Sequence, residues 1–416
     1  MRIAVIGGGI SGLVAAYQLQ DKAEVTVFDA NDYIGGHTHT VDVHRGGGHF
    51  AVDTGFIVYN DWTYPNFVQL LSRLNVATQT SDMSFALSDP KSGFAYAAPQ
   101  LGGLFAHKRN LLSPRFYQML WDIVRFSKDG PTFLKDCHDE VPLSTFFEQG
   151  RYSQAFLSRY LIPMISAIWS AGCGTVGELP ARYFLHFFEH HGLMNLRDRP
   201  QWRVISGGSR NYIGPLVRGY SERVYTRSPV HQVTRYADHV TLKMPNDELL
   251  SFDHVIMAVH SDQALRILAD PSDGERDILG AIPYQANDVS LHTDTSILPR
   301  NRRAWASWNY RMDPKTHDQA HLTYHMNRLQ SLNAPCDFLV SLNQNDHIAP
   351  EHQIQEFNYS HPAYSASSVA AQARHQEISG VNRTHYCGAY WGYGFHEDGV
   401  KSALDACAWF DAGVLV

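Results

Sequence analysis

The sequence has few cysteines and no pattern that would join them into a disulfide framework. Five cysteines are scattered along 416 residues without a C-x-x-C pair: Cys137, Cys173, Cys336, Cys387 and Cys407. This spacing favours reduced thiols in a cytoplasmic protein. The 23 histidines include no H-E-x-x-H or other compact ligand cluster, so we expect no metal site.

Long hydrophobic runs are also missing. No apolar stretch reaches the roughly 18 residues that a membrane-spanning helix needs, and we expect no signal peptide because a strand pattern begins at the first residue. The formal net charge is −7, and this lack of positive charge argues against a partner that is a nucleic acid. With 44% hydrophobic and 18% charged residues, the composition is that of a globular enzyme of about two or three domains.

The N-terminal segment has a strand–helix–strand pattern. Residues 1–6 (MRIAVI) form an apolar run that is typical of a buried parallel strand, and a helical pattern follows at 13–19. Residues 24–28 (EVTVF) predict a second strand, which ends at Asp29. This order of elements predicts the first unit of a dinucleotide-binding fold.

A G-x-G-x-x-G run lies between the first strand and the helix. Gly7 allows a tight turn, Gly9 lets the backbone approach a pyrophosphate, and Gly12 lets the helix pack closely on the strand. The helix N-terminus supplies free N–H groups for the phosphates. Asp29 follows at the usual spacing, where an acid accepts ribose hydroxyls and repels a 2′-phosphate, so NADP is disfavoured.

Two further glycine-containing runs follow. The run GGHT at 35–38 passes the backbone by the pyrophosphate a second time, with His37 as a donor; a simple surface turn is the alternative interpretation. Residues 50–56 (FAVDTGF) predict a strand, and Gly55 near its end allows bare backbone to approach a flat ligand.

Together these motifs resemble the amine oxidase and phytoene desaturase superfamily of FAD flavoproteins. One bacterial branch of it, described as predicted NAD/FAD-binding, amine-oxidase-like proteins, is similar in further runs. These are DTGFIVYNDWTYPN (53–66), QWRVISGGSRNY (201–212), FDHVIMAVHSDQAL (252–265), AWASWNY (304–310) and CGAYWGYGFHEDGVKSAL (387–404). Members of the branch are often encoded near cyclopropane-fatty-acid-synthase-like methyltransferases, and some relatives act as desaturases of modified fatty acyl lipids.

The resemblance implies an α/β fold with a Rossmann-type FAD-binding domain and a discontinuous α+β substrate domain. We assign residues 1–65, 201–280 and 376–416 to the FAD-binding domain, and 66–200 and 281–375 to the substrate domain.

Within the substrate domain, residues 66–200 are expected to be mostly helical. Its sheet is expected from strand-like segments at 286–293, 305–310, 322–326 and 337–342.

The C-terminal signature is expected to close the flavin site. In the resembled superfamily a strand ends in a glycine, here Gly388, at the ribityl chain, and the next helix points its N-terminus at flavin N1. That helix is expected to begin near 398–400, and its dipole stabilises negative charge by roughly 0.3–1 kcal/mol. The superfamily usually has an acid where this sequence has Tyr390, so Tyr390 or backbone is expected to make that contact. Cys387 matches no clear attachment motif, and we predict non-covalent FAD.

The predicted cofactor-binding residues come from all of these runs. They are Gly7, Gly9, Ile10, Ser11, Gly12, Asp29, Ala30, Gly35, Gly36, His37, Thr38, Thr54, Gly55, Phe56, Val230, Gly388, Tyr390, Gly399 and Val400.

Hydride transfer to a flavin depends on proximity and orientation more than on an acid or a base, and the sequence contains no catalytic triad. The predicted catalytic residues are Trp391, Tyr393 and His396. His396 is the candidate for proton handling, because an unperturbed histidine titrates near neutrality; the alternative is that it only forms hydrogen bonds within its loop. Further residues are expected around the flavin and the substrate pocket, namely Phe56, Tyr59, Tyr390, Phe395, Trp308 and Tyr310.

Residues 105–128 carry Trp121 and five cations against the single acid Asp122. The cations are Lys108, Arg109, Arg115, Arg125 and Lys128. Ser113 and Pro114 predict the start of a helix. The stretch is interpreted as a membrane-surface patch through which a lipid enters, or as a helix with one core face and one solvated basic face.

The sequence therefore predicts a FAD-dependent oxidoreductase that takes hydride from a C–H bond of a hydrophobic, lipid-linked substrate. We expect it in the cytoplasm, in peripheral contact with the inner membrane face, with a small-molecule or lipid substrate and a methyltransferase as partners. The alternatives are an amine oxidase acting on a soluble amine, a redox-neutral flavin isomerase or mutase, and a non-catalytic FAD-binding partner of a lipid methyltransferase.

Overall fold

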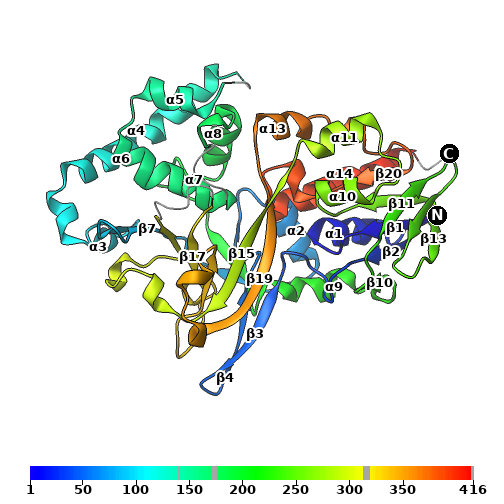
Figure 1. Cartoon of the computed structure of the whole chain (residues 1–416), viewed down its shortest axis with the longest axis horizontal. Helices are drawn as coiled ribbons and strands as arrows, with labels where there is room; N and C mark the ends of the chain where they lie inside the picture. The colour runs from blue at the N-terminus through cyan, green and yellow to red at the C-terminus, as the bar shows by residue number, and fades with distance from the viewer. Residues whose placement is uncertain (139–140, 171–175, 313–318, 414–416) are drawn as a thin grey trace.

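The computed structural model describes residues 1–138, 141–170, 176–312 and 319–413 (Figure 1). Its first sheet has five parallel strands in the order β10-β2-β1-β14-β20. Their bounds are β1 Arg2–Ile6, β2 Glu24–Phe28, β10 Val224–Tyr225, β14 His254–Met257 and β20 Thr384–Tyr386. The two predicted N-terminal strands are confirmed, and their carboxyl ends meet at the edge where such sheets bind ligands.

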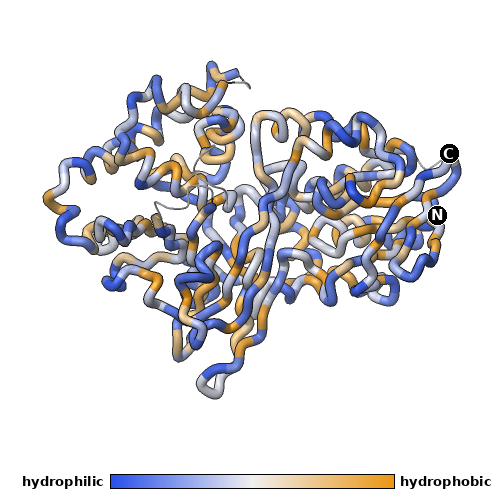
Figure 2. The backbone as a smooth tube through the Cα atoms, in the orientation of Figure 1, coloured by the Kyte–Doolittle hydropathy of each residue, from blue (hydrophilic) through white to orange (hydrophobic). Residues whose placement is uncertain are grey.

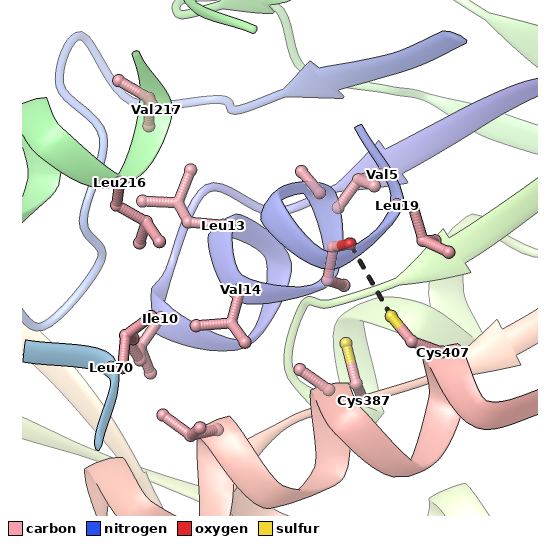
Figure 3. Close-up of a cluster of buried hydrophobic side chains, with 14 of the residues drawn as sticks. Val5, Ile10, Leu13, Val14, Leu19, Leu70, Leu216, Val217, Cys387 and Cys407 are labelled. Carbon is pink, nitrogen blue, oxygen red and sulfur yellow. Dashed lines mark hydrogen bonds between the residues drawn. The ribbon is translucent and has the colours of Figure 1, made fainter. Parts of the chain in front are cut away.

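Strand β1 is buried on both faces because its side chains alternate between two cores. Ile3 and Val5 pack with helices α1 (Ile10–Leu19) and α14 (His396–Gly413), a cluster that Figure 3 shows around Val5. Ala4 and Ile6 face the second core. The elements around that core are β11 Gln232–Arg235, β12 Val240–Lys243, β13 Leu249–Phe252, α10 Ser261–Ile267, α11 Asp273–Gly280 and α13 Ala366–Gln372.

Helix α1 lies between β1 and α14 at two glycine contacts. A Cβ on Gly12 would overlap the carbonyl oxygen of Gly7 and would lie 3.0 Å from Cβ of Ala258. A Cβ on Gly399, in α14, would lie 2.8 Å from Cγ2 of Ile10. The predicted packing role of Gly12 is therefore steric, and Gly399 plays the same role where α14 meets α1.

The second sheet has seven strands in the order β19-β15-β18-β17-β16-β7-β8. All neighbours are antiparallel except β16 and β7. The bounds are β7 Phe85–Asp89, β8 Phe94–Ala98, β15 Tyr284–His292, β16 Trp308–Arg311, β17 Leu322–His325, β18 Leu339–Leu342 and β19 Gln353–Pro362. The four predicted substrate strands are confirmed, and the long strand β19 was not predicted.

Helices from the middle of the chain cover one end of this sheet (Figure 1). They are α3 Leu101–Leu104, α4 Pro114–Asp136, α5 Leu143–Gly150, α6 Gln154–Phe156, α7 Ile162–Trp169 and α8 Ala181–His190. The predicted start of α4 is confirmed, because Oγ of Ser113 accepts the N–H of Phe116. The prediction that residues 66–200 are mostly helical is confirmed, with three strands within 78–98 as the exception. Strands β6 (Thr78–Thr80) and β7 pair with strands distant in sequence, and β8 pairs with β7.

A buried carboxylate joins the smaller sheets to the rest of the fold. Asp53 ends β4 and accepts hydrogen bonds from Oγ1 of Thr40 (2.6 Å), the N–H of Ser209 (2.8 Å) and Nε2 of Gln330 (2.9 Å). The strand predicted over residues 50–56 therefore ends at Asp53, where the chain turns. The remaining elements are α2 Pro65–Arg73, β3 Thr40–Arg45, β4 Gly48–Asp53, β5 Tyr59–Asn60, β6 Thr78–Thr80, β9 Trp202–Ile205, α9 Ile213–Val217 and α12 Met326–Leu329.

Hydrophobic segments lie mainly along the interior strands and helices, and the outer turns are mostly hydrophilic (Figure 2). Across the described part of the chain, every helix is too short or too polar to cross a membrane.

We expect Gly12→Ala to lower the free energy of unfolding by about 1–3 kcal/mol, because the added methyl group overlaps the Gly7 carbonyl in a closely packed turn. Chemical denaturation of the purified protein measures this change. Gly214→Ala is the matched control, since a Cβ there meets no described atom within 4 Å. Equal stability of the two variants would contradict the packing role of Gly12.

Candidate active site

Two backbone turns meet at the carboxyl end of β1. Gly7 has a φ of +108°, which a residue with a side chain rarely adopts. The N–H of Gly35 donates to the carbonyl of Gly8 at 2.7 Å, and a Cβ on Gly36 would lie 3.2 Å from Cα of Gly9. A Cβ on Gly9 itself would meet no described atom within 4 Å. The turns therefore expose bare backbone to an open space at the N-terminus of α1.

Asp29 lies beside these turns at the end of β2. Its Oδ2 accepts the N–H of Gly8 at 2.6 Å and its Oδ1 accepts the N–H of Asn31 at 2.8 Å. Burial raises the pKa of the carboxyl group, and these two N–H groups act in the opposite direction. Each oxygen keeps an acceptor position, so Asp29 can still accept hydrogen bonds from a ribose.

The open space is part of a cavity of about 650 Å³ that extends from the two turns to the seven-stranded sheet. Most of the predicted site residues line it. They are Gly7, Gly9, Ile10, Ser11, Asp29, Ala30, Gly35, Gly36, His37, Gly55, Phe56, Val230, Gly388, Tyr390, Tyr393 and His396.

The other predicted cofactor residues lie behind the cavity wall. Gly12 and Gly399 act in helix packing, and the side chain of Val400 is buried in the core of the first sheet. Thr38 and Thr54 form hydrogen bonds with tyrosine side chains instead of facing the cavity.

Trp391, predicted as a catalytic residue, is not among the residues that line the cavity. Its ring packs on His375, with centroids 4.2 Å apart, and faces the core under β14. Next to it, Gly392 has no side chain, and the carboxylate of Asp398 occupies the space where a Cβ would lie. Tyr393, two residues later, is the residue that reaches the cavity.

His396 is the first residue of α14 and is buried. Its ring stacks on Phe56 with centroids 3.5 Å apart, and its Nε2 is hydrogen-bonded with Oγ1 of Thr38 (3.0 Å) and Oη of Tyr212 (3.2 Å). Burial, followed by the nearby His37, lowers the pKa of His396 well below its usual value. The ring is therefore neutral at physiological pH, and the argument from an ordinary histidine pKa does not hold here.

The end of the cavity that α7, β16 and β17 line is apolar and aromatic. Its walls are Ile57, Val58, Ile168, Trp169, Trp308, Tyr324, Tyr393 and Phe395. Trp308 was predicted here and its buried Nε1 has no partner among the described residues. Tyr59 and Tyr310 were also expected, but both are packed into hydrophobic cores away from the cavity.

Sequence reasoning missed a group of rings opposite the glycine turns. Tyr359 and His361, both on β19, approach His37 with centroids 5.1 and 5.2 Å away, and His260 lies 6.4 Å from it. Nε2 of His37 is buried without a hydrogen-bond partner in the described ranges. Residues 357, 359 and 361 lie on one face of the strand, because successive side chains of a strand point to opposite faces. This spacing of two residues was the signal in the sequence that could have revealed the group.

These features fit FAD. The bare turns at Gly9 and Gly36 accommodate a pyrophosphate, the helix N-terminus and the unpaired Nε2 of His37 offer donors, and Asp29 suits the ribose. The aromatic end suits a flat ring system beside Phe56 and Phe395.

Charged groups are scarce in this cavity. Of the described residues that line it, Asp29 is the one carboxylate and Arg266 the one arginine, and none is a lysine. Among the described ranges no group of three or more histidines, cysteines and acids is placed to hold a metal ion.

The fold and the cavity define a FAD-binding α/β oxidoreductase. The sequence profile described as flavin containing amine oxidoreductase matches residues 10–302, which is more than half of the chain, and the protein belongs to that family. Its cofactor is FAD, and the predicted family and fold are confirmed.

Curated relatives are distant in sequence. Flavin-containing amine oxidase A of Bos taurus is 25% identical over 62% of this chain and 49% of its own length. Flavin-containing amine oxidase B of Rattus norvegicus is 25% identical over 65% of this chain and 52% of its own length. The chain spans about half the length of the curated relatives it matches.

Solved structures share the fold over almost the whole chain. A CLA-producing fatty acid isomerase from P. acnes has a TM-score of 0.70 at 16% identity and 98% coverage of both chains. Wild-type putrescine oxidase bound to putrescine gives 0.69 at 13% identity and 99% coverage of both. Cyclohexylamine oxidase from Brevibacterium oxydans IH-35A gives 0.66 at 17% identity and 98% coverage of both.

We expect Gly9→Ala to weaken FAD binding by about 1–3 kcal/mol, roughly 10- to 100-fold, because the methyl group enters the space next to the bare turn. Quenching of flavin fluorescence on titration of the FAD-free protein measures the affinity. The backbone at Gly9 has a φ of −75°, which alanine adopts, so the stability of the FAD-free protein should not change. Wild-type affinity in this variant would place the pyrophosphate elsewhere.

We expect His396→Gln to lower the rate of flavin reduction by a similar factor at every pH from about 5.5 to 8. The physical reason is that burial lowers the pKa of His396 well below its usual value, so the imidazole is already neutral near pH 7 and glutamine replaces an uncharged ring. The rate as a function of pH in anaerobic stopped-flow experiments measures this. A wild-type pKa near 6.5 that disappears in the variant would instead assign proton handling to His396.

Proposed function

We propose that this protein is a FAD-dependent oxidoreductase that takes a hydride from a C–H bond of a hydrophobic, lipid-linked substrate. The observation that carries the proposal is the cavity end beyond Phe56 and Phe395, whose walls are aromatic or aliphatic and carry no charged side chain in the described residues. An acyl chain gains free energy by leaving water for such a surface.

FAD, when bound, supplies the two-electron acceptor for the hydride. The residues of the chain bind and orient the substrate and exclude water. Tyr393 and Phe395 restrict where the reacting C–H bond can lie, and the neutral ring of His396 keeps Phe56 in place by stacking. The buried Nε1–H of Trp308, unpaired within the described chain, offers one hydrogen bond to an acceptor oxygen of the substrate.

We also propose that FAD is held without a covalent bond and that the domain division predicted from the sequence applies. Cys387 is buried in the core of the first sheet and does not line the cavity. The strands of the five-stranded sheet come from residues within 1–65, 201–280 and 376–416, and those of the seven-stranded sheet from 66–200 and 281–375.

A redox-neutral isomerase acting on an acyl chain is the second candidate. The same apolar cavity end supports it, and a structure described as a fatty acid isomerase shares the fold. A soluble amine is less well supported, because a cationic substrate would find no carboxylate at the apolar end among the described residues.

We expect a lipid extract to bleach the visible flavin absorbance of the FAD-loaded protein in the absence of oxygen. Val58→Asp should slow the bleaching by at least about tenfold, because it buries a charge in the wall that holds the chain. Val68→Asp is the matched control, since Val68 is exposed on α2.

The outcomes separate the candidates. Bleaching by simple amines with release of hydrogen peroxide in air, and no response to lipid, would contradict the proposal and favour an amine oxidase. Conversion of a fatty acyl chain to an isomer without net bleaching would favour the isomerase. Denaturation should release free FAD in every case if the cofactor is non-covalent.

A further inference from the structure

Five of the exposed large hydrophobic side chains in the described residues lie on α3, the short 3₁₀ helix Lys108–Leu112 and the start of α4. We call them the tip surface: Leu101, Leu111, Leu112, Tyr117 and Trp121. Leu101 is 73% exposed, Leu112 88% and Trp121 64%. Side chains of this size that face water in one place usually mark an interaction site.

The local structure holds these side chains outward. Phe116 and Met119 of α4 point into the helical core, so Tyr117 and Trp121 lie on the opposite face. The buried side chain of Asn110 donates to the carbonyls of Ala95 and Leu104, both at 3.0 Å, and fixes the turn from which the next two leucines project. The exposure is therefore a property of the folded backbone.

Positive charge surrounds the tip surface. Lys108, Arg109 and Arg115 are exposed among its leucines, and residues 90–121 contain no acid. A second segment adds to this charge, because Nδ2 of Asn301 donates to the carbonyl of Ala106 at 2.6 Å. This bond places the exposed arginines of that segment next to α3: Arg300, Arg302 and Arg303.

Not all cations predicted for this region belong to the surface. Arg125 pairs with the buried carboxylate of Asp122 at 2.9 Å and lies over the ring of Tyr152. It therefore acts within the helical core. The cations that surround the tip surface are therefore those of the 3₁₀ helix, of the first turn of α4 and of the segment with Arg300, Arg302 and Arg303.

We propose that the tip surface docks on a bilayer that contains anionic phospholipids. Leucine and tryptophan side chains enter the boundary between head groups and acyl chains, and the surrounding lysine and arginine side chains contact the phosphates. Figure 2 shows a hydrophobic segment between hydrophilic ones at this outer edge of the molecule. The proposal concerns a surface separate from the cavity, and it holds for any substrate that the flavin oxidises.

Co-sedimentation of the FAD-loaded full chain with vesicles tests the proposal. We expect binding to vesicles of equal parts phosphatidylglycerol and phosphatidylcholine, much weaker binding to phosphatidylcholine alone, and a loss of affinity at high salt. The double variant Leu112→Glu/Trp121→Glu should weaken binding by at least about tenfold. Arg115→Gln should weaken it by about fivefold, the effect of about 1 kcal/mol per cation at an anionic surface.

Leu249→Glu is the matched control, because Leu249 is 66% exposed on β13 beside Asp247 and Glu248, and its cross-strand partner Lys243 is ion-paired with Asp247 at 2.8 Å. Its vesicle binding should equal that of the wild type. An unchanged flavin spectrum and melting temperature show that each variant is folded. Vesicle co-sedimentation requires no substrate, so its outcome is independent of the proposed function.

Wild-type protein that binds no vesicle, or variants that bind as the wild type does, would overturn the proposal. A change from dimer to monomer in the double variant during size-exclusion chromatography, without vesicle binding by the wild type, would assign the tip surface to a second copy of this chain instead.

Discussion

Direct contact between two glycine turns determines the geometry of the whole cavity. The N–H of Gly35 bonds to the carbonyl of Gly8, and Gly36 lies against Gly9 with no side chain between them. Because the turns touch, the N-terminus of α1 and the segment that carries His37 face the same space. A methyl group on Gly36 would press on Cα of Gly9 and move the two turns apart, and the N–H groups at the N-terminus of α1 would no longer face the same space as His37.

The two glycine turns and Asp29 were predictable because their roles depend on residues that are neighbours in the sequence. The glycines before α1, Asp29 after β2 and the run 35–38 each follow from local backbone requirements, which need no knowledge of distant contacts. The same holds for the four substrate strands, whose apolar residues give a clear signal. Residues that act by packing, such as Gly399 and Val400, were instead predicted as cofactor contacts, because a motif does not show which side of a helix faces a ligand.

The missed parts depend on pairing across long stretches of chain. Strand β19 (QIQEFNYSHP) is largely polar, and it is held by β15, about seventy residues away in sequence. Its position decides that His361 and Tyr359 face His37. The different surroundings of Trp391 and Tyr393 are also tertiary: Trp391 packs in the core with His375, and Tyr393 lines the cavity. Tertiary packing determines the position of such strands and the direction of such side chains, and residue type alone does not predict either.

Helix α4 is apolar on two sides, and this property connects the cavity with the outer surface. One side packs into the core built around Phe116, Phe126 and Phe188, and the cavity residues Trp308, Tyr393 and Phe395 pack against that same core. The other side carries Tyr117 and Trp121 into solvent. Docking on lipid would give these two exposed rings an apolar environment. The shared core is closely packed and changes shape little, so it would hold the cavity at a fixed distance from the bilayer. A lipid substrate would then have to leave the bilayer and reach the flavin through the protein, because the cofactor cannot move toward the membrane.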